Sequence, residues 1–197
     1  MDNNLDRIIS LANKNNGFIS NADLKKSGIS TKYLTVLLKD GKIEKIKPGL
    51  YILADSIADE FYAAIYNTPA VFSHTASLYL HNFSDRTPSE FDITVANNYA
   101  GSLSKNPKVN LFYVQNKLFK IGVEKIKTPH GATVDAYDLE RTICDIIRNE
   151  KRVETEIFVS ALQKYAIYRN KRLNVLLKYA AMLGISDKVE EKLRILL

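Results

Sequence analysis

Lysine side chains are concentrated between Ser20 and Leu53 of this 197-residue chain. Seven lysines fall in that segment, where only Asp23, Asp40 and Glu44 oppose them. Ammonium groups gathered on one small domain attract the phosphates of nucleic acids, and such clusters are typical of DNA-binding surfaces. We therefore predict that this segment binds duplex DNA. Its lysines are Lys25, Lys26, Lys32, Lys39, Lys42, Lys45 and Lys47.

Two short helices with a glycine turn between them are predicted to position these lysines. Ser20 and Asp23 have the spacing of a capping box, which begins a helix. Gly28 can take the left-handed conformation that ends this helix, and Ser30 is expected to cap the next one. This order is typical of a helix-turn-helix, whose second helix enters a DNA major groove.

The second helix of the pair is expected to have one buried and one exposed face. Leu34, Leu37 and Leu38 recur at i, i+3 and i+4, so they are predicted to form a single buried stripe. Two short segments follow, at Ile43–Lys47 and Leu50–Leu53, and the Pro-Gly pair between them suits a type II turn. The pattern predicts a hairpin that serves as the wing of a winged helix-turn-helix.

The predicted contacts to DNA come from the exposed helix face, the residues just before it and the wing. Lys32 and Lys39 suit phosphates or guanine edges, while Thr35 and Val36 suit other base edges. Free N–H groups and hydroxyls at the helix start favour a phosphate. The alternative is a solvated, lysine-rich surface on a domain that binds protein. The predicted DNA-binding residues are Lys25, Lys26, Ser30, Thr31, Lys32, Thr35, Val36, Lys39, Lys42, Lys45 and Lys47.

Composition bounds the class of protein. Hydrophobic residues make up 46% of the chain, which is enough for packed cores and argues against disorder. The net charge of +6 permits a polyanionic partner without requiring one. Cys144 is the single cysteine, so an internal disulfide is excluded. No apolar run approaches the ~20 residues of a membrane span, and the polar N-terminus does not resemble a signal peptide. We expect a soluble, cytoplasmic protein with no membrane partner.

The remaining pattern predicts a mixed α+β fold with two domains. We expect a winged helix-turn-helix over residues 1–54 and a mixed sheet with C-terminal helices over residues 55–197. Helices are predicted at 5–12, 56–67, 73–81, 139–147, 153–165, 173–181 and 188–196, and strands at 91–95 (half-buried), 109–114, 120–127 and 132–136.

Motifs for nucleotide, metal or nucleophilic chemistry are absent from the sequence. Neither GxxxxGK[ST] nor GxGxxG occurs, so no phosphate-binding glycine loop is predicted. His74, His81 and His130 are the only histidines, and none pairs with a cysteine at zinc-binding spacing. We interpret the histidines as structural and Cys144 as a core residue. No catalytic residue, cofactor or metal ion is predicted.

A nuclease remains an alternative on the basis of the carboxylates. Asp92 and Asp135 lie on predicted strands and would hold a cation if those strands paired. Glu124 is followed by Lys125, whereas a restriction-type site has one residue between its acid and its lysine. A hydrogen bond between each carboxylate and a neighbouring turn is the simpler interpretation, and the nuclease is the less favoured alternative.

Other charged residues are predicted to have structural roles. Arg86 lies between Asp85 and Glu90 and is expected to hold that turn together through charge-assisted bonds. Glu140 suits the dipole at the start of the next helix. The basic residues of the C-terminal helices, which cluster at 169–172, are interpreted as a solvated face, with a working basic patch left open.

The order of three segments resembles that of a known family. These are Gly41–Tyr51 (with KPGLY), Ser73–Val95 (SHTASLYLHNFSDRTPSEFDITV) and Tyr137–Arg148 (YDLERTICDIIR). Together they resemble the AbiEi family, the antitoxins of the AbiE phage-resistance, type IV toxin–antitoxin systems. The resemblance extends over nearly the whole chain.

The resemblance implies two activities and no enzymatic one. The N-terminal domain would bind inverted repeats in its own promoter and repress the operon, with Lys32, Lys39, Lys45 and Lys47 at the family's basic positions. The C-terminal domain would neutralise a cognate toxin of nucleotidyltransferase type without forming a stable complex. We assign no residue to neutralisation, and we expect a monomer that binds operator DNA as two copies. A winged-helix transcription factor with a sensing C-terminal domain is the main alternative.

Overall fold

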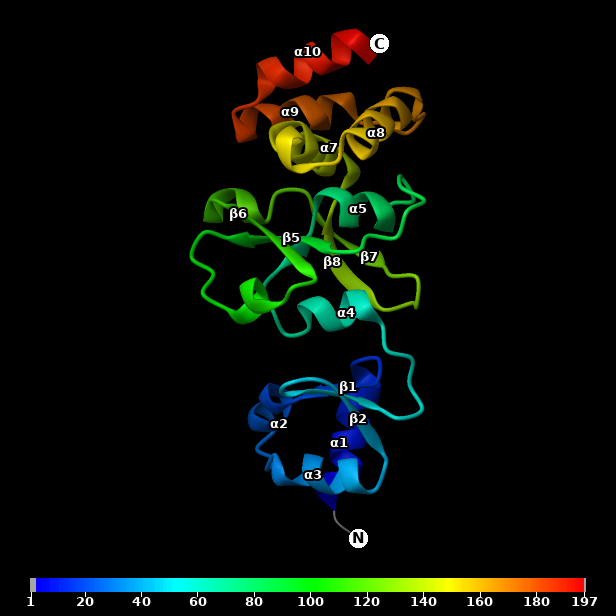
Figure 1. The fold of residues 1–197 in the computed structure, drawn as a ribbon. Coiled ribbons are helices and arrows are strands. Elements are labelled where there is room, and N and C mark those ends of the chain that lie inside the picture. Colours follow the sequence, from blue (N-terminus) through cyan, green and yellow to red (C-terminus); the bar gives the residue numbers. More distant parts are fainter. Residues whose placement is uncertain (1–2, 197) are drawn as a thin grey trace. The chain divides into compact units, whose positions relative to one another are not determined.

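The computed structural model describes residues 3–196 and divides into two compact units (Figure 1). The N-terminal unit ends at Asn67, and the C-terminal unit begins at Thr68. These units differ from the predicted domains, 1–54 and 55–197, by the segment 55–67, which groups with the N-terminal unit.

The N-terminal unit is a small three-stranded sheet with helices, as the winged-helix prediction required. Strand β3 lies in the middle and pairs antiparallel with both β1 and β2, giving the order β1-β3-β2. Its elements are α1 (Asn3–Lys14), β1 (Phe18–Ser20), α2 (Asn21–Lys26), α3 (Lys32–Lys39), β2 (Ile43–Lys47), β3 (Leu50–Leu53) and α4 (Glu60–Ile65).

The wing is the hairpin of β2 and β3. Gly49 has φ +76°, the left-handed conformation that a type II turn needs at its third residue. The register shifts between Lys45 and Lys47, so a β-bulge interrupts the pairing with β3 near the turn. The predicted hairpin is therefore confirmed, with an irregularity that its sequence pattern did not indicate.

The capping box at the start of α2 is confirmed. The Ser20 N–H donates to Asp23 Oδ2 at 2.8 Å, and the Asp23 N–H donates to Ser20 Oγ at 3.2 Å. Gly28 has φ +67° just after the helix, as expected of a left-handed terminator.

Two predictions about α3 were wrong in detail. Leu34 and Leu37 are buried, but Leu38 is 36% exposed and lies about 100° around the helix axis from Leu37, at the edge of the buried stripe. Thr31, not Ser30, occupies the N-cap position and makes no side-chain cap bond. Ser30 Oγ instead accepts a hydrogen bond from the backbone N–H of Lys32, two residues later in the chain, at 3.3 Å.

Helix α4 joins the N-terminal unit through aromatic packing and hydrogen bonds. It is shorter than the predicted helix over 56–67, because Asp59 caps its start and accepts from the Tyr62 N–H. The Tyr62 ring lies 5.3 Å from the Phe18 ring between centroids. The Tyr66 hydroxyl donates to Asp23 at 2.9 Å, and the Asn67 amide donates to the same carboxylate at 2.8 Å. The start of α2 and the residues that follow α4 therefore share one half-buried carboxylate acceptor.

The C-terminal unit combines a mixed five-stranded sheet with a set of helices. The strand order is β6-β5-β4-β8-β7, with β5/β6 and β4/β8 parallel and β4/β5 and β7/β8 antiparallel. Its elements are β4 (Val71–Phe72), α5 (His74–Leu80), β5 (Phe91–Ala96), η1 (Ser102–Lys105), β6 (Val109–Val114), α6 (Asn116–Phe119), β7 (Val123–Lys127), β8 (Thr133–Tyr137), α7 (Leu139–Arg148), η2 (Glu150–Arg152), α8 (Thr155–Ile167), α9 (Leu173–Leu183) and α10 (Ser186–Leu196).

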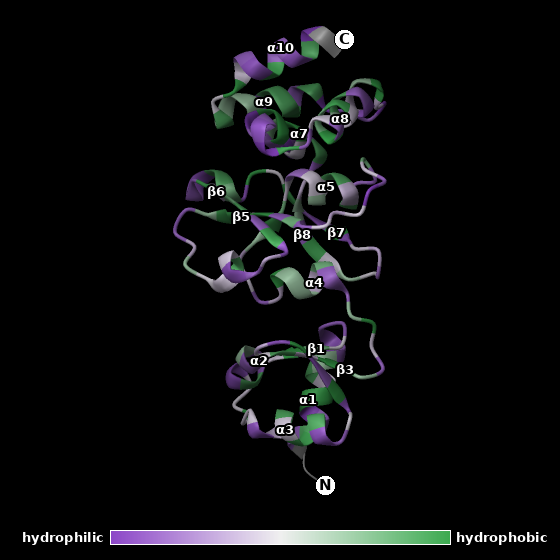
Figure 2. Ribbon diagram, in the orientation of Figure 1, coloured by the Kyte–Doolittle hydropathy of each residue, from purple (hydrophilic) through white to green (hydrophobic). Residues whose placement is uncertain are grey.

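Helix α7 is the centre of the core of this unit. Every residue from Leu139 to Ile147 is buried, the charged ones included. Apolar residues of α5, α8, α9 and α10 surround it, as Leu78, Leu162 and Leu176 illustrate. Helix α9 is mainly hydrophobic, whereas α7 and α10 also carry many hydrophilic residues (Figure 2).

The sheet departs from the predicted strands at three places. Strand β4 has two residues, too few for a periodic signal, and was missed. The predicted strand at 120–127 begins only at Val123, because the short helix α6 and a turn precede it. Residues Phe91 to Val95 are all buried, not half-buried, since β5 lies inside the sheet and contacts both α5 and α6.

The charged pairs of the C-terminal unit were also predicted incompletely. Arg86 binds Glu154 at 3.0 Å and does not hold its own turn together. Glu140 lies in the first turn of α7 as expected, but it is buried and bound by Arg172. Burial alone raises the pKa of Glu140, and the hydrogen bonds from Arg172 outweigh it and hold that pKa below its usual value. One member of the basic cluster at 169–172, Arg172, therefore forms an ion pair within the unit.

We predict that Asp23→Ala lowers the free energy of unfolding by about 1–2 kcal/mol, because it removes the capping box and the acceptor for Tyr66 and Asn67. Urea denaturation at neutral pH would measure the loss. Asp55→Ala, at an exposed position, is the matched control and should change stability by less than about 0.5 kcal/mol.

The same variant should show a pH dependence. Burial works to raise the pKa of Asp23, but hydrogen bonds from Ser20, Asn67 and Tyr66 outweigh it, so this pKa lies below its usual value. The stabilisation by Asp23 is therefore complete above the ordinary carboxyl pKa and is lost as pH falls through the lowered one. A difference between wild type and Asp23→Ala that grew in acid would contradict this assignment.

Candidate nucleic-acid interface

Helix α3 presents opposite faces to the core and to solvent. Leu34 and Leu37, 2% and 0% exposed, pack with α1 residues such as Ile8. Lys32 and Lys39 are exposed and lie about 10 Å apart along the helix axis. Thr35 and Val36 are exposed between them, and Val36 is 43% exposed despite being apolar. The outer face of α3 therefore offers two cations that flank a small, partly apolar surface.

The residues before α3 and at the end of α2 add to the exposed surface. Lys25 and Lys26 occupy the last turn of α2, and both are exposed. Ser30 and Thr31 are exposed in the turn that leads into α3. These four predicted contact residues thus belong to the end of α2 and to the turn that leads into α3.

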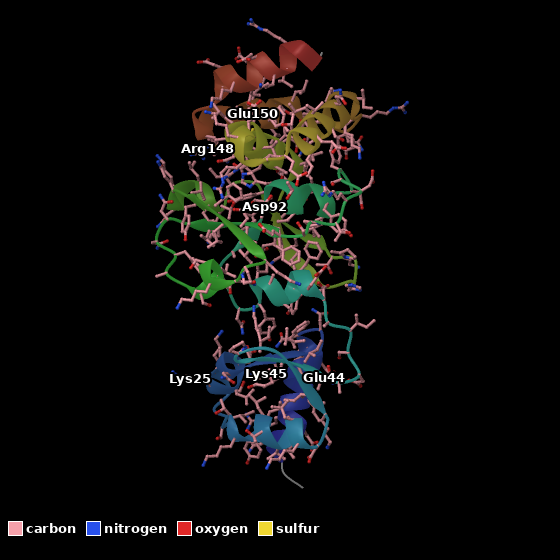
Figure 3. All side chains as sticks on the ribbon, viewed as in Figure 1. Lys25, Glu44, Lys45, Asp92, Arg148 and Glu150 are labelled. Carbon is pink, nitrogen blue, oxygen red and sulfur yellow. The ribbon has the colours of Figure 1, made fainter. Side chains whose placement is uncertain are left out.

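The wing contributes two further cations. Lys42 precedes β2 and Lys45 lies within it, and both are exposed (Figure 3 labels Lys45). Glu44 is exposed beside Lys45, so the positive charge of the wing is partly offset.

Lys47 differs from the other predicted contact residues. Its ammonium group donates to the Ala63 carbonyl of α4 at 2.7 Å, and its side chain is half-buried. Burial lowers the pKa of this ammonium group. We conclude that Lys47 fastens the wing to α4, and we do not include it among the proposed phosphate contacts. The sequence pattern missed this role because Ala63 lies sixteen positions away.

The exposed cations of the N-terminal unit are free of acidic partners. Within residues 3–196, no ion pair joins an acid to any of the six lysines that remain in the set. An unpaired ammonium group in water keeps its full attraction for an external phosphate, since no internal ion pair must be broken first. The six lysines are Lys25, Lys26, Lys32, Lys39, Lys42 and Lys45.

The carboxylates of the nuclease alternative do not converge. Strand β4 lies between β5 and β8, so Asp92 and Asp135 are on strands about 10 Å apart. Asp92 accepts hydrogen bonds from Thr75 and Asn110, and Asp135 pairs with Lys125 at 2.7 Å. Over the part of the chain that the structure describes, no three His, Cys, Asp or Glu side chains are grouped to hold a metal ion.

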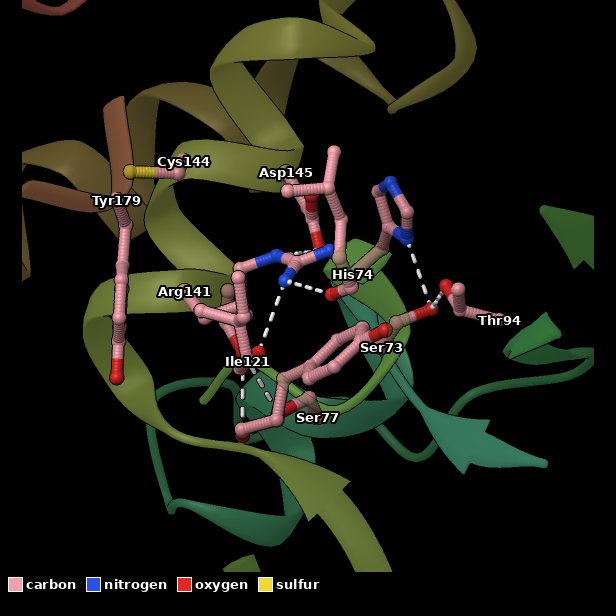
Figure 4. Close-up of polar contacts among 12 residues, drawn as sticks. Ser73, His74, Ser77, Thr94, Ile121, Arg141, Cys144, Asp145 and Tyr179 are labelled. Atoms are coloured by element: carbon pink, nitrogen blue, oxygen red, sulfur yellow. Dashed lines mark hydrogen bonds and ion pairs between the residues drawn. The ribbon is translucent and has the colours of Figure 1, made fainter. Parts of the chain in front are cut away.

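The C-terminal unit contains a buried polar network that the sequence pattern did not reveal (Figure 4). Arg141 is 1% exposed, and its Nε donates to Asp145 Oδ2 at 3.0 Å. Its Nη1 donates to the carbonyl oxygens of Leu118 and Ile121. The only signal in the sequence is the i, i+4 spacing of an arginine and an aspartate on an otherwise apolar helix face.

The two helix histidines are structural, as predicted, and they do not form a joint site. The His74 Nδ1 hydrogen-bonds with Ser73 Oγ at 2.9 Å, and its ring stacks on Phe112 with centroids 3.7 Å apart. Burial lowers the pKa of His74 to about 3, with a further contribution from Arg152, Arg141 and Arg148. His81 bonds the Tyr137 carbonyl at 2.9 Å.

Cys144 is buried, and burial raises the pKa of its thiol to about 12. A thiol with this pKa is protonated at neutral pH and so is a poor nucleophile. Its place in the apolar core around α7 agrees with the predicted core role.

The fold and the basic surface define the N-terminal unit as a winged helix-turn-helix domain. Residues 6–54 match a family whose description is transcriptional regulator, AbiEi antitoxin. The match agrees with the AbiEi resemblance of the sequence for the N-terminal domain. It covers the winged helix and does not extend to Ser73–Val95 or Tyr137–Arg148.

The complete chain is also similar to a solved structure. The RV2827C protein from Mycobacterium tuberculosis aligns over 98% of this chain and 77% of its own, with a TM-score of 0.65 and 12% sequence identity. At this identity the likeness concerns the fold. Among curated proteins no sequence matches the chain. None of the helices described here has the length and apolar character to cross a membrane.

We predict that the His74 imidazole makes stability fall as pH decreases. In the unfolded chain it takes up a proton near its ordinary pKa of about 6.5, whereas the folded protein resists protonation down to about 3. The free energy of unfolding should therefore drop by up to about 1.4 kcal/mol per pH unit across this window. Chemical denaturation of wild type and His74→Gln between pH 7 and pH 4 would isolate this slope. His130→Gln, at an exposed histidine, should keep the wild-type slope.

Proposed function

We propose that the chain is an antitoxin of a type IV toxin–antitoxin system that represses its own operon by binding operator DNA. The observation that carries the proposal is the set of six unpaired, exposed lysines on the helix-turn-helix and wing of a domain that matches AbiEi antitoxin regulators. Lys32, Lys39 and Lys45 are assigned to phosphates, and Thr35 and Val36 to base edges.

The proposed partners follow from the same assignment. The operator would contain inverted repeats, each bound by one copy of a chain that is monomeric in solution. The C-terminal unit would neutralise a nucleotidyltransferase-type toxin without a stable complex between the two proteins. We propose no catalytic step for this chain and no cofactor.

We predict that replacing Lys32, Lys39 and Lys45 together with alanine weakens binding to the duplex upstream of the protein's own coding sequence. Each lost phosphate contact should reduce the slope of log K against log salt by about 0.9. Fluorescence anisotropy across a salt series would measure both quantities. The matched control replaces three exposed lysines of the C-terminal unit, Lys105, Lys127 and Lys178, and should keep the wild-type slope.

Lys47 provides a further contrast in the same titration. Because its ammonium group is bound to Ala63 within the fold, Lys47→Met should leave the salt slope unchanged. A triple variant at Lys32, Lys39 and Lys45 that retained the wild-type slope would contradict the assignment of these side chains.

We predict that the same triple variant of the full chain still restores growth when a neighbouring nucleotidyltransferase-type gene is expressed. The reason is that the three lysines belong to the proposed operator surface, whereas neutralisation is assigned to the C-terminal unit. The measurement is colony formation during induced co-expression, with antitoxin levels matched by immunoblot. Loss of rescue by a folded, equally abundant variant would show that operator binding and neutralisation are not separable.

A further inference from the structure

A small polar hollow in the C-terminal unit lies where strand β6 meets the end of helix α7. Its volume is about 90 Å³. It is distinct from the lysine surface, because all of its lining residues belong to the C-terminal unit. The lining residues used below are His74, Tyr113, Arg141, Asp145, Arg148 and Arg152.

The charged residues of the hollow form one stripe along the chain. Arg141, Asp145, Arg148 and Arg152 are spaced at i, i+4, i+7 and i+11, which places the first three on one face of α7. Arg152 follows in the short helix η2. The side chains of three arginines and one aspartate therefore line the same hollow of about 90 Å³.

Arg141 forms the buried wall of the hollow, and its hydrogen bonding is incomplete. Its Nε is bound by Asp145 and its Nη1 by two carbonyl oxygens, while the guanidinium lies 4.2 Å from the centroid of the Tyr137 ring. Its Nη2 has no hydrogen-bond partner within residues 3–196. A buried donor without an acceptor is costly, so this group calls for an acceptor from outside the chain.

The two other arginines lie at the open side of the hollow and differ in their contacts. Arg152 donates to Asn110 Oδ1 at 2.7 Å and lies 3.8 Å from the centroid of the Phe112 ring, so its position is held. Arg148 is exposed and has no hydrogen bond or ion pair in the described part of the chain. Arg148 can therefore bind a ligand without breaking a hydrogen bond or an ion pair, although Asp145 also attracts it electrostatically.

The hollow carries an excess of positive charge. Asp145 balances one of the three arginines, and its carboxylate is already bound by Arg141 Nε. His74 adds no charge near neutral pH, because its pKa is lowered to about 3. Its Nε2 faces the Asn149 side-chain amide at 3.0 Å, so the ring is occupied by internal contacts. Asp92 also interacts electrostatically with Arg152 from outside the hollow. Arg148 and Arg152 form no ion pair with a carboxylate in the described part of the chain, so the hollow favours an added anion.

We propose that this hollow binds a phosphate group, either as the free anion or as the phosphoryl group of a small molecule. A phosphate presents several oxygens to guanidinium donors and carries nearly two negative charges at neutral pH, whereas a carboxylate has two oxygens and one charge. The two available sources are inorganic phosphate and a nucleoside phosphate. Tyr113 is 53% exposed and lines the hollow, so its ring is available to stack on a base if the source is a nucleotide.

The test is calorimetric titration of the full chain with inorganic phosphate and, separately, with ATP. Arg148→Gln removes a guanidinium that has no internal hydrogen bond or ion pair, so it should weaken binding about tenfold or more without loss of fold. The double variant Arg148→Gln/Arg152→Gln should bind weaker still. Arg169→Gln, at an exposed arginine outside the hollow, is the matched control and should bind as wild type does.

Two comparisons identify the source and separate this proposal from DNA binding. Tighter binding of ATP than of phosphate, weakened by Tyr113→Ala, assigns a nucleotide; equal affinities that are insensitive to Tyr113→Ala assign free phosphate. The triple variant at Lys32, Lys39 and Lys45 should retain phosphate binding, since those lysines lie in the other unit. No binding by wild type up to about 10 mM of either ligand, or wild-type affinity in the Arg148→Gln/Arg152→Gln variant, would overturn the proposal.

Discussion

Burial of Leu34 and Leu37 determines which face of α3 reaches solvent. These two side chains pack into the core of the N-terminal unit beside Ile8 and Leu24, so the helix cannot rotate without exposing them. Each buried leucine is worth about 1.5–3 kcal/mol, which is more than the repulsion between exposed, hydrated lysines costs. The apolar contact therefore holds Lys32 and Lys39 on the outer face, and the proposed DNA surface depends on that contact.

Carboxylate groups connect separate elements of secondary structure in both units, through different partners. In the N-terminal unit, Asp23 accepts hydrogen bonds from the start of α2 and from the segment after α4, so it fastens a connecting helix to the winged helix. In the C-terminal unit, Glu140 and Asp138 bind Arg172 and so join the starts of α7 and α9. Neither arrangement uses the lysines on the helix-turn-helix, which leaves those cations unpaired.

The pattern of residues close together in sequence was sufficient to predict most elements of the N-terminal unit. The capping box at Ser20, the left-handed Gly49 and the hairpin are all properties of residues close together in sequence, and each was predicted. The errors that concern charged side chains arise from contacts between residues distant in sequence. Arg86 pairs with Glu154, and Lys47 binds a carbonyl of α4, and no periodicity in the sequence encodes either partner. The arginine hollow was missed for the same reason, because β6 and the end of α7 are brought together only by the sheet.

The contrast between the two sets of cations separates their proposed roles. A lysine on an exposed helix face attracts any phosphate backbone, since a flexible, hydrated ammonium group imposes little geometry. Arg141 is buried, and two of its three guanidinium nitrogens are already hydrogen-bonded. Only an acceptor placed in line with the N–H groups of Nη2 can bond the third nitrogen. The first arrangement suits a long polymer read along its length, and the second suits a small anion of defined shape. The two proposed surfaces lie in different units, and the small hollow cannot admit a duplex, so DNA bound to the lysines does not compete with a phosphate in the hollow.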